Sequence, residues 1–99
     1  MFIEFADQDL RRLHEEPGYR LPRMDQQLTR AFQKATRFIE AASDERDLAA
    51  MKSLRFEKLK GARSGQHSIR LHNQWRLILQ LVENPKGTVV VVVEVVDYH

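Results

Sequence analysis

The last three residues of the chain, Asp97, Tyr98 and His99, place a carboxylate, a phenol and an imidazole next to one another. Such side chains can hold or transfer protons, and an imidazole does so most readily near neutral pH. Terminal residues are mobile unless the segment before them is anchored. Here the preceding run "VVVVVEVV" strongly favours β-structure. We therefore expect a strand to hold this C-terminal triplet in place.

Positive charge is concentrated in one part of the chain. The formal net charge is only +2, yet residues 52–76 carry seven Lys and Arg side chains against a single acid, Glu57. A local excess of this size attracts a polyanion such as nucleic acid, whatever the total charge of the chain. A charge run considered by itself has a simpler alternative, a solvated surface without a ligand.

Length and composition limit the number of domains, the metal sites and the cellular location that the chain can have. The 99 residues form a single domain, residues 1–99, with one modest core. The absence of cysteine excludes disulfides and thiolate metal sites, and it favours a reducing, cytoplasmic location. The four histidines lack the spacing of a zinc motif, so we expect neither a metal nor another cofactor. The acidic start "MFIEFADQ" and the lack of a long apolar run predict no signal peptide and no membrane association.

The first half of the chain has the pattern of helices. A short strand is predicted in "MFIEF", followed by a helix that Asp7 caps and that ends before Pro17. A long amphipathic helix follows "YRLP", with Pro22 in its first turn. Its apolar stripe is Met24, Leu28, Ala31, Phe32, Ala35, Phe38, Ile39 and Ala42. Ser43 is predicted to cap a third, short helix over residues 44–51.

From Leu54 onward the apolar pattern has a period of two, which is typical of strands. We predict strands in "SLRFEKL", "HSIRLH", "WRLILQLV" and "TVVVVVEVVDYH". A loop, "LKGARSGQ", and hairpin turns at Asn73-Gln74 and "NPKG" separate them. Helices followed by strands indicate an α+β fold. We expect an N-terminal short strand and two or three helices packed on one face of a mainly antiparallel sheet of four or five strands.

Strand alternation predicts where the basic residues lie. If Ile69 and Leu77 face the helices, Arg70 and Arg76 share the open face of the sheet. Lys60 and Arg63 then lie in the loop at the rim, and the last strand brings the C-terminal triplet alongside. A cationic sheet bordered by an acid, a phenol and an imidazole suits a phosphodiester better than a small neutral metabolite.

The segment "EKLKGARSGQHSIRLHNQWRL", followed by the terminal "VVDYH", closely resembles HigB-type toxins of the RelE/ParE superfamily. At the level of motifs the resemblance covers residues 54–99, and the combination of "GQHSIR", "QWR" and "DYH" is specific. It implies a RelE-like fold and a bacterial toxin that docks in the ribosomal decoding site and cuts mRNA. The implied partners are a helix-turn-helix, HigA-like antitoxin, the small ribosomal subunit with its mRNA, and operator DNA only through the antitoxin.

The resemblance also implies roles for individual residues. Metal-free RNA cleavage needs a base for the 2′-hydroxyl, cations for the phosphate and an acid for the departing 5′-oxygen. The implied catalytic set is Lys60, Arg76, Asp97, Tyr98 and His99. Lys58, Arg63, His67 and Arg70 are the implied RNA contacts, although alternation allows His67 to face inward instead. Some relatives carry a histidine just before L-K-G, where this chain has Phe56-Glu57-Lys58, so either Glu57 replaces that base or the C-terminus supplies it.

Two other functions remain open on the sequence alone. A relative of the ParE type would inhibit gyrase by binding and would not need the C-terminal triplet. A nucleic-acid-binding regulatory module would use the basic face for affinity to phosphates and cut nothing.

Overall fold

The computed structural model describes residues 1–98, and in it a short strand and the helices precede the remaining strands of one sheet. The elements are β1 (Phe2–Phe5), α1 (Gln8–Glu15), α2 (Gln26–Ala41), α3 (Glu45–Ala50), β2 (Glu57–Lys58), β3 (Gln66–Arg70), β4 (Trp75–Asn84) and β5 (Gly87–Asp97). The strand order is β1-β5-β4-β3-β2, with β1 parallel to β5 and the other pairs antiparallel. The predicted α+β fold is confirmed, with three helices and five strands.

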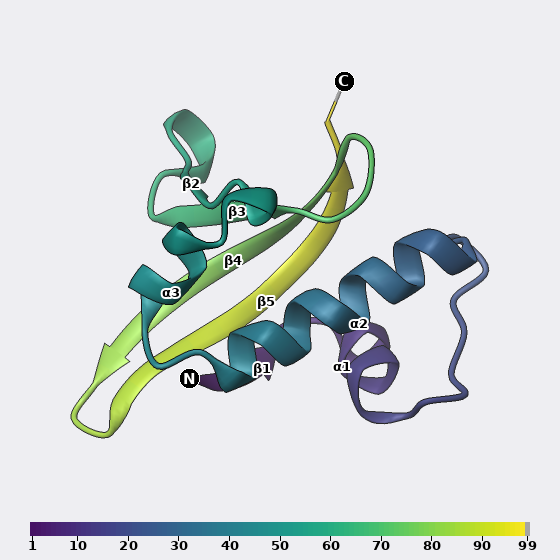
Figure 1. Ribbon diagram of the computed structural model, residues 1–99, viewed down its shortest axis with the longest axis horizontal. Coiled ribbons are helices and arrows are strands. Elements are labelled where there is room, and N and C mark those ends of the chain that lie inside the picture. Colours follow the sequence, from purple (N-terminus) through teal and green to yellow (C-terminus); the bar gives the residue numbers. More distant parts are fainter. Residues whose placement is uncertain (99) are drawn as a thin grey trace.

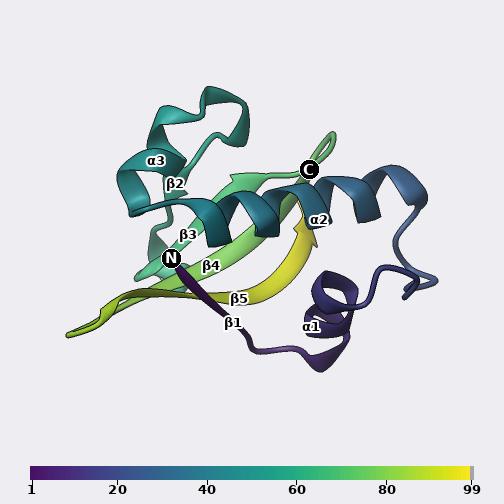
Figure 2. The same ribbon diagram turned by 60° about the horizontal axis from the view of Figure 1, so that its bottom comes forward.

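The apolar side of α2 packs on one face of this sheet. Figure 2 shows α2 lying over the sheet, and Figure 1 shows it beside β5 and running in a similar direction. Leu28, Phe32 and Ile39 are almost completely buried there. The sheet side of the same core consists of Ile69, Leu77, Leu79, Val90 and Val92. Burial of this apolar surface is the main stabilising term of the fold. No helix within residues 1–98 is long and apolar enough to cross a bilayer.

The helix starts are set by aspartates. Asp7 caps α1 as predicted, by accepting a hydrogen bond from the N–H of Leu10. The prediction for α2 was wrong by about one turn, because Pro22 lies before the helix and Asp25 is the cap. The Asp25 carboxylate accepts from the N–H of Leu28 at 2.8 Å. A carboxylate at this position satisfies a free backbone donor and interacts favourably with the helix dipole, which a proline ring does not.

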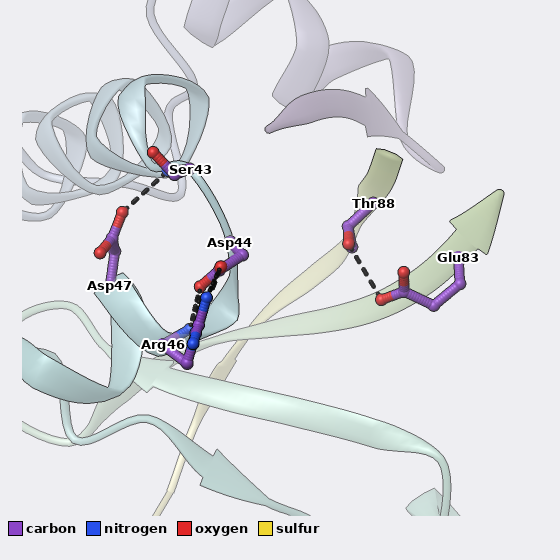
Figure 3. A network of polar contacts seen from close by, with 6 residues as sticks. All are labelled: Ser43, Asp44, Arg46, Asp47, Glu83 and Thr88. Atoms are coloured by element: carbon purple, nitrogen blue, oxygen red, sulfur yellow. Dashed lines mark hydrogen bonds and ion pairs between the residues drawn. The ribbon is translucent and has the colours of Figure 1, made fainter. Parts of the chain in front are cut away.

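At the start of the short helix α3, two carboxylates accept hydrogen bonds from backbone N–H groups, as Figure 3 shows. Asp44, and not Ser43 as predicted, is the cap and accepts from the N–H of Arg46 at 2.9 Å. The Asp47 carboxylate reaches back and accepts from the N–H of Ser43 at 2.8 Å. Each carboxylate thus satisfies one backbone N–H at the start of the helix, Asp44 inside it and Asp47 just before it. The same figure shows Thr88 donating to Glu83 across the β4–β5 hairpin.

The strand predicted in "SLRFEKL" is much shorter in the structure. Residues Lys52–Leu54 form a 3-10 turn, and Arg55 follows it with a positive φ of 47°. This left-handed residue interrupts the extended backbone, and only Glu57–Lys58 pairs with β3. Both predicted hairpin turns are present. Asn73 takes a φ of 53° in the first, and Pro85 and Lys86 form the loop between the paired residues Asn84 and Gly87 in the second.

The position of the α2 start can be tested by stability measurements. We expect Asp25→Ala to lower the free energy of unfolding by about 1 kcal/mol, because the Leu28 N–H loses its acceptor. Asp25→Ser keeps a capping oxygen and should cost much less. Pro22→Ala lies outside the helix and serves as the control. Urea titrations would contradict this assignment if the Pro22 variant lost as much stability as the Asp25→Ala variant.

Candidate nucleic-acid interface

The strand register defines a second face of the sheet, opposite α2, which we call the outer face. Ile69 pairs with Leu77, and both face the helices. Because side chains alternate along a strand, the neighbouring pair Arg70 and Arg76 points to the outer face. Arg76 pairs in turn with Val96 of β5. The expectation that these two arginines share a face of the sheet is therefore confirmed.

The middle of the outer face is less open than the sequence suggested. One row of paired residues crosses four strands there, namely Glu57, Ser68, Ile78 and Glu94. Ser68 is 1% exposed and Ile78 is 0% exposed, whereas the acids at the two ends are exposed. The outer face thus has a small buried centre of its own, with a carboxylate on either side.

Arg63 extends from the loop after β2 to this row. Its Nη2 donates to Glu94 Oε1 at 3.2 Å, and its Nη1 donates to Gln66 Oε1 at 3.1 Å. Gln66 pairs with Gln80 on the same face. Arg63 therefore lies over the outer face rather than pointing away from its rim. A fixed guanidinium presents its remaining N–H groups in a defined direction, which suits an anionic ligand.

Sequence reasoning missed the role of Glu94. A signal was present, since Glu94 is the single acid in the run "VVVVVEVV". Simple alternation from the buried Val90 and Val92 would have directed Glu94 into the core. The register shifts between Ile78 and Leu79, and the extra residue is Val93. This bulge turns Glu94 to the outer face, where it meets Arg63.

Arg76 is half-buried and folded against the β3–β4 turn. Its Nη1 donates to the carbonyl oxygens of Asn73 at 3.3 Å and Trp75 at 3.2 Å. Within residues 1–98, no side chain or carbonyl bonds its Nε or Nη2. The turn thus holds the arginine by one nitrogen and leaves an edge of the planar fork for a bidentate contact to a phosphate.

The C-terminal end of β5 lies beside this arginine. The Tyr98 N–H donates to the carbonyl oxygen of Gln74 at 2.9 Å, so β5 stays paired with the end of β4. Alternation from Val96 places Tyr98, which is 38% exposed, on the same face as Arg76. Asp97 pairs with Trp75, which packs against the core, so register directs Asp97 to the helix side. His99, the third member of the C-terminal triplet, lies outside the described residues.

The other residues identified from sequence lie apart from the Arg70–Arg76 pair. Lys58 pairs with His67 in the row that faces the helices. The His67 ring stacks on Phe56, with centroids 4.8 Å apart and planes 5° from parallel. Burial lowers the pKa of His67, Glu45 opposes that shift, and Lys58 adds to it. This environment favours the inward-facing alternative for His67. Lys60 is exposed in the loop just before the 3-10 turn Gly61–Arg63.

The described residues can bind an anion, and no metal centre is formed among them. Within residues 1–98, no group of three His, Asp or Glu side chains is placed to hold a metal ion. The outer face instead combines Arg63, Arg70 and Arg76 with an exposed phenol. Guanidinium groups recognise phosphate oxygens, and an aromatic ring can stack on a base, so this surface suits single-stranded RNA.

Comparison with known proteins gives a consistent result. The family model described as "RelE-like toxin of type II toxin-antitoxin system HigB" matches residues 3–99. Among solved structures, the "YoeB/ParE toxin from Agrobacterium tumefaciens" is similar, with a TM-score of 0.60 and 13% sequence identity. That similarity covers 100% of both chains, and at this identity it concerns the fold alone. No curated protein matches this sequence.

The buried position of His67 predicts a pH effect on stability. Its folded-state pKa is below its usual value, so the unfolded chain binds the proton more readily as the pH falls below about 6.5. The free energy of unfolding should therefore decrease from neutral pH into that range. His67→Phe keeps the stack on Phe56 and removes the titration, so this variant should lose less stability between about pH 7.5 and pH 5.5. Urea titrations at both pH values measure the difference. An equal loss in both proteins would mean that His67 does not contribute.

Proposed function

This chain belongs to the HigB family of RelE-like toxins of type II toxin–antitoxin systems, and from this premise we propose that it is a ribosome-dependent endoribonuclease that cleaves mRNA. Cleavage of mRNA during translation would inhibit protein synthesis and growth. A type II toxin has an antitoxin as its partner. We further propose that this antitoxin is a HigA-like helix-turn-helix protein, and that the toxin acts in the cytoplasm on the small ribosomal subunit and its mRNA.

One observation carries the proposal: Arg70, Arg76 and Tyr98 share the outer face at one end of the sheet. Arg70 and Arg76 are directly paired, and β5 brings Tyr98 to the same end through its bond to Gln74. Two like charges placed opposite each other repel, so their pairing destabilises the sheet unless an anion or solvent screens them. A phosphate between the two guanidinium groups would relieve this repulsion.

The proposed reaction uses the chain's own side chains. A base takes the proton of the 2′-hydroxyl, the 2′-oxygen attacks the adjacent phosphorus, and the bond from phosphorus to the 5′-oxygen breaks. An acid then protonates the 5′-oxygen, and a 2′,3′-cyclic phosphate remains. In our proposal Arg76 binds the phosphate oxygens bidentately and Lys60 adds a point charge. Asp97 and His99 transfer the protons, and Tyr98 stacks on a base or orients its neighbour.

Glu57 is a second candidate for the base. It lies on the outer face, in the same row as Glu94. Its strand partner Ser68 is two residues from Arg70 along β3. The position of Asp97 on the helix side of the strand makes this alternative more important than it was from sequence alone. A carboxylate on the face that carries the arginines is well placed to accept a proton from an RNA bound there.

The RNA contacts proposed from sequence separate into two groups. Arg63 and Arg70 support the proposal, since Arg63 bonds Glu94, the strand partner of Ile78, and Arg70 pairs with Arg76. Lys58 and His67 belong to the helix-facing row. Contact of these two with RNA would require a strand of RNA that passes around the edge at β2.

A translating extract tests the function directly. We expect the wild-type protein to produce new mRNA 5′ ends in primer extension, and a variant without His99 to produce none. Undiminished cleavage by the shortened protein would refute the role of His99. Loss of gyrase activity without mRNA cleavage would indicate a ParE-like toxin instead. If neither mRNA cleavage nor loss of gyrase activity occurs, the result would indicate a binding module.

The role of Arg76 is tested by a substitution that conserves charge. Arg76→Lys keeps the positive charge but removes the planar fork, so mRNA cleavage should fall by roughly tenfold or more if binding is bidentate. The bonds from Nη1 to Asn73 and Trp75 are also affected, so the free energy of unfolding must be measured in parallel. Lys86→Arg, in the distant β4–β5 hairpin, is the control: it also exchanges lysine and arginine, but away from the proposed site. Full activity of the Arg76→Lys protein would mean that a simple surface cation is sufficient.

A further inference from the structure

An apolar groove of about 600 Å³ lies between α2, the turn after α3 and the end of β3. Its apolar lining is Ala31, Ala35, Phe38, Met51, Leu54 and Leu71. Figure 2 shows α3 and the turn after it beside the C-terminal half of α2. The groove is on the helix side of the sheet, and it meets the outer face at Arg70, at the end of β3.

The rim of the groove has one sign of charge. Lys34 and Arg37 of α2 and Arg70 at the end of β3 line it, and none of the described residues that line it is acidic. A smaller hollow of about 380 Å³ adjoins it at Phe38 and Met51, and alanines and one acid, Asp47, complete the lining of that hollow. Met51 is 41% exposed at this junction. A flexible thioether on an open surface adapts readily to a partner.

We propose that this groove is the docking site for an acidic amphipathic helix of the antitoxin. The proposal rests on the chain being a type II toxin, which has an antitoxin partner, and not on its being a nuclease. An amphipathic helix places apolar side chains into a groove at spacings of three and four residues, and its flanks can carry the carboxylates that the basic rim attracts.

The lining favours a protein segment over RNA. Aliphatic and aromatic side chains gain free energy when they are removed from water by other apolar groups, whereas a ribose–phosphate backbone offers few such groups. The outer face differs in this respect, because arginines and a phenol lie on it. The two surfaces therefore suit two different classes of ligand.

Arg70 connects the two surfaces. It lines the groove, and it pairs with Arg76 in the sheet. A carboxylate of the docked helix that binds Arg70 would remove one cation from the RNA-binding end of the outer face. Occupation of the groove would thus weaken RNA binding without the antitoxin covering Arg76 itself. In this way the groove would serve as an inhibitory site.

Charge reversal at the rim tests the docking site. The double variant Lys34→Glu, Arg37→Glu changes two exposed side chains of α2, and the single variant Arg30→Glu changes an exposed residue of the same helix that does not line the groove. Each toxin is produced with its cognate antitoxin, separated from it and titrated with purified antitoxin by calorimetry. We expect the double variant to bind roughly tenfold or more weakly, and Arg30→Glu to bind like the wild type.

A second variant tests the apolar part of the groove. Ala31→Trp places a large ring in the groove and should also weaken antitoxin binding, with thermal unfolding measured to confirm that the protein is folded. Binding of the double variant equal to that of Arg30→Glu would overturn the proposal. Weaker binding to a single-stranded RNA oligonucleotide, with antitoxin binding unchanged, would also overturn it and assign the rim to nucleic acid.

The outcome is independent of whether the toxin cuts mRNA. Lys34 and Arg37 are not part of the proposed catalytic set, so cleavage by the antitoxin-free double variant should equal that of the wild type. If no toxin cleaves mRNA while the double variant still loses antitoxin binding, the docking site stands and the nuclease proposal fails. If the wild type cleaves mRNA and the double variant binds antitoxin normally, the nuclease proposal stands and the docking site fails.

Discussion

The pairing of β4 with β5, and the single extra residue within it, determines which face of the sheet each side chain at the end of β5 occupies. Val90 and Val92 face the core before the bulge, and Val95 packs against the core after it. Val93 is the residue that the register skips. Every side chain after Val93 is therefore on the opposite face from the one that strict alternation would give. Glu94 and Tyr98 reach the outer face through this shift, and Asp97 does not.

The two faces of the sheet have different physical roles. One face is buried under α2 and provides most of the apolar core. On the other face, Ser68 and Ile78 are the fully buried side chains among residues 1–98, and charged residues lie around them. A small domain has little apolar surface to bury, so a face without a covering layer of helices is left with limited stabilisation. The Arg63–Glu94 contact crosses this face, although a partly exposed ion pair contributes little to stability. Its value lies in the orientation of Arg63.

The arginine pair and the apolar groove meet at the end of β3. This strand extends beyond its short partner β2, because β2 pairs only with residues 67 and 68. The end of β3 therefore has a free edge next to α2 and the turn Lys52–Leu54. The left-handed Arg55 follows this turn, whose residues Ser53 and Leu54 line the groove. This end of β3 is where the proposed RNA-binding face and the proposed docking groove meet.

The sequence by itself determined the class of fold, the long apolar stripe of α2, the cap at Asp7, both hairpin turns and the position of Arg70 opposite Arg76. These features depend on side-chain period, turn residues and local capping, which act within a few residues of the chain. The tertiary structure alone decided that α2 begins at Asp25, that β2 is short, that Glu94 holds Arg63 and that Asp97 and Tyr98 point to opposite faces. The reason is that a bulge and a left-handed residue follow from how the strands fit together over long distances. The left-handed Arg55 leaves no mark on the hydrophobic pattern, and the bulge leaves only the single charge of Glu94 in a run of valines.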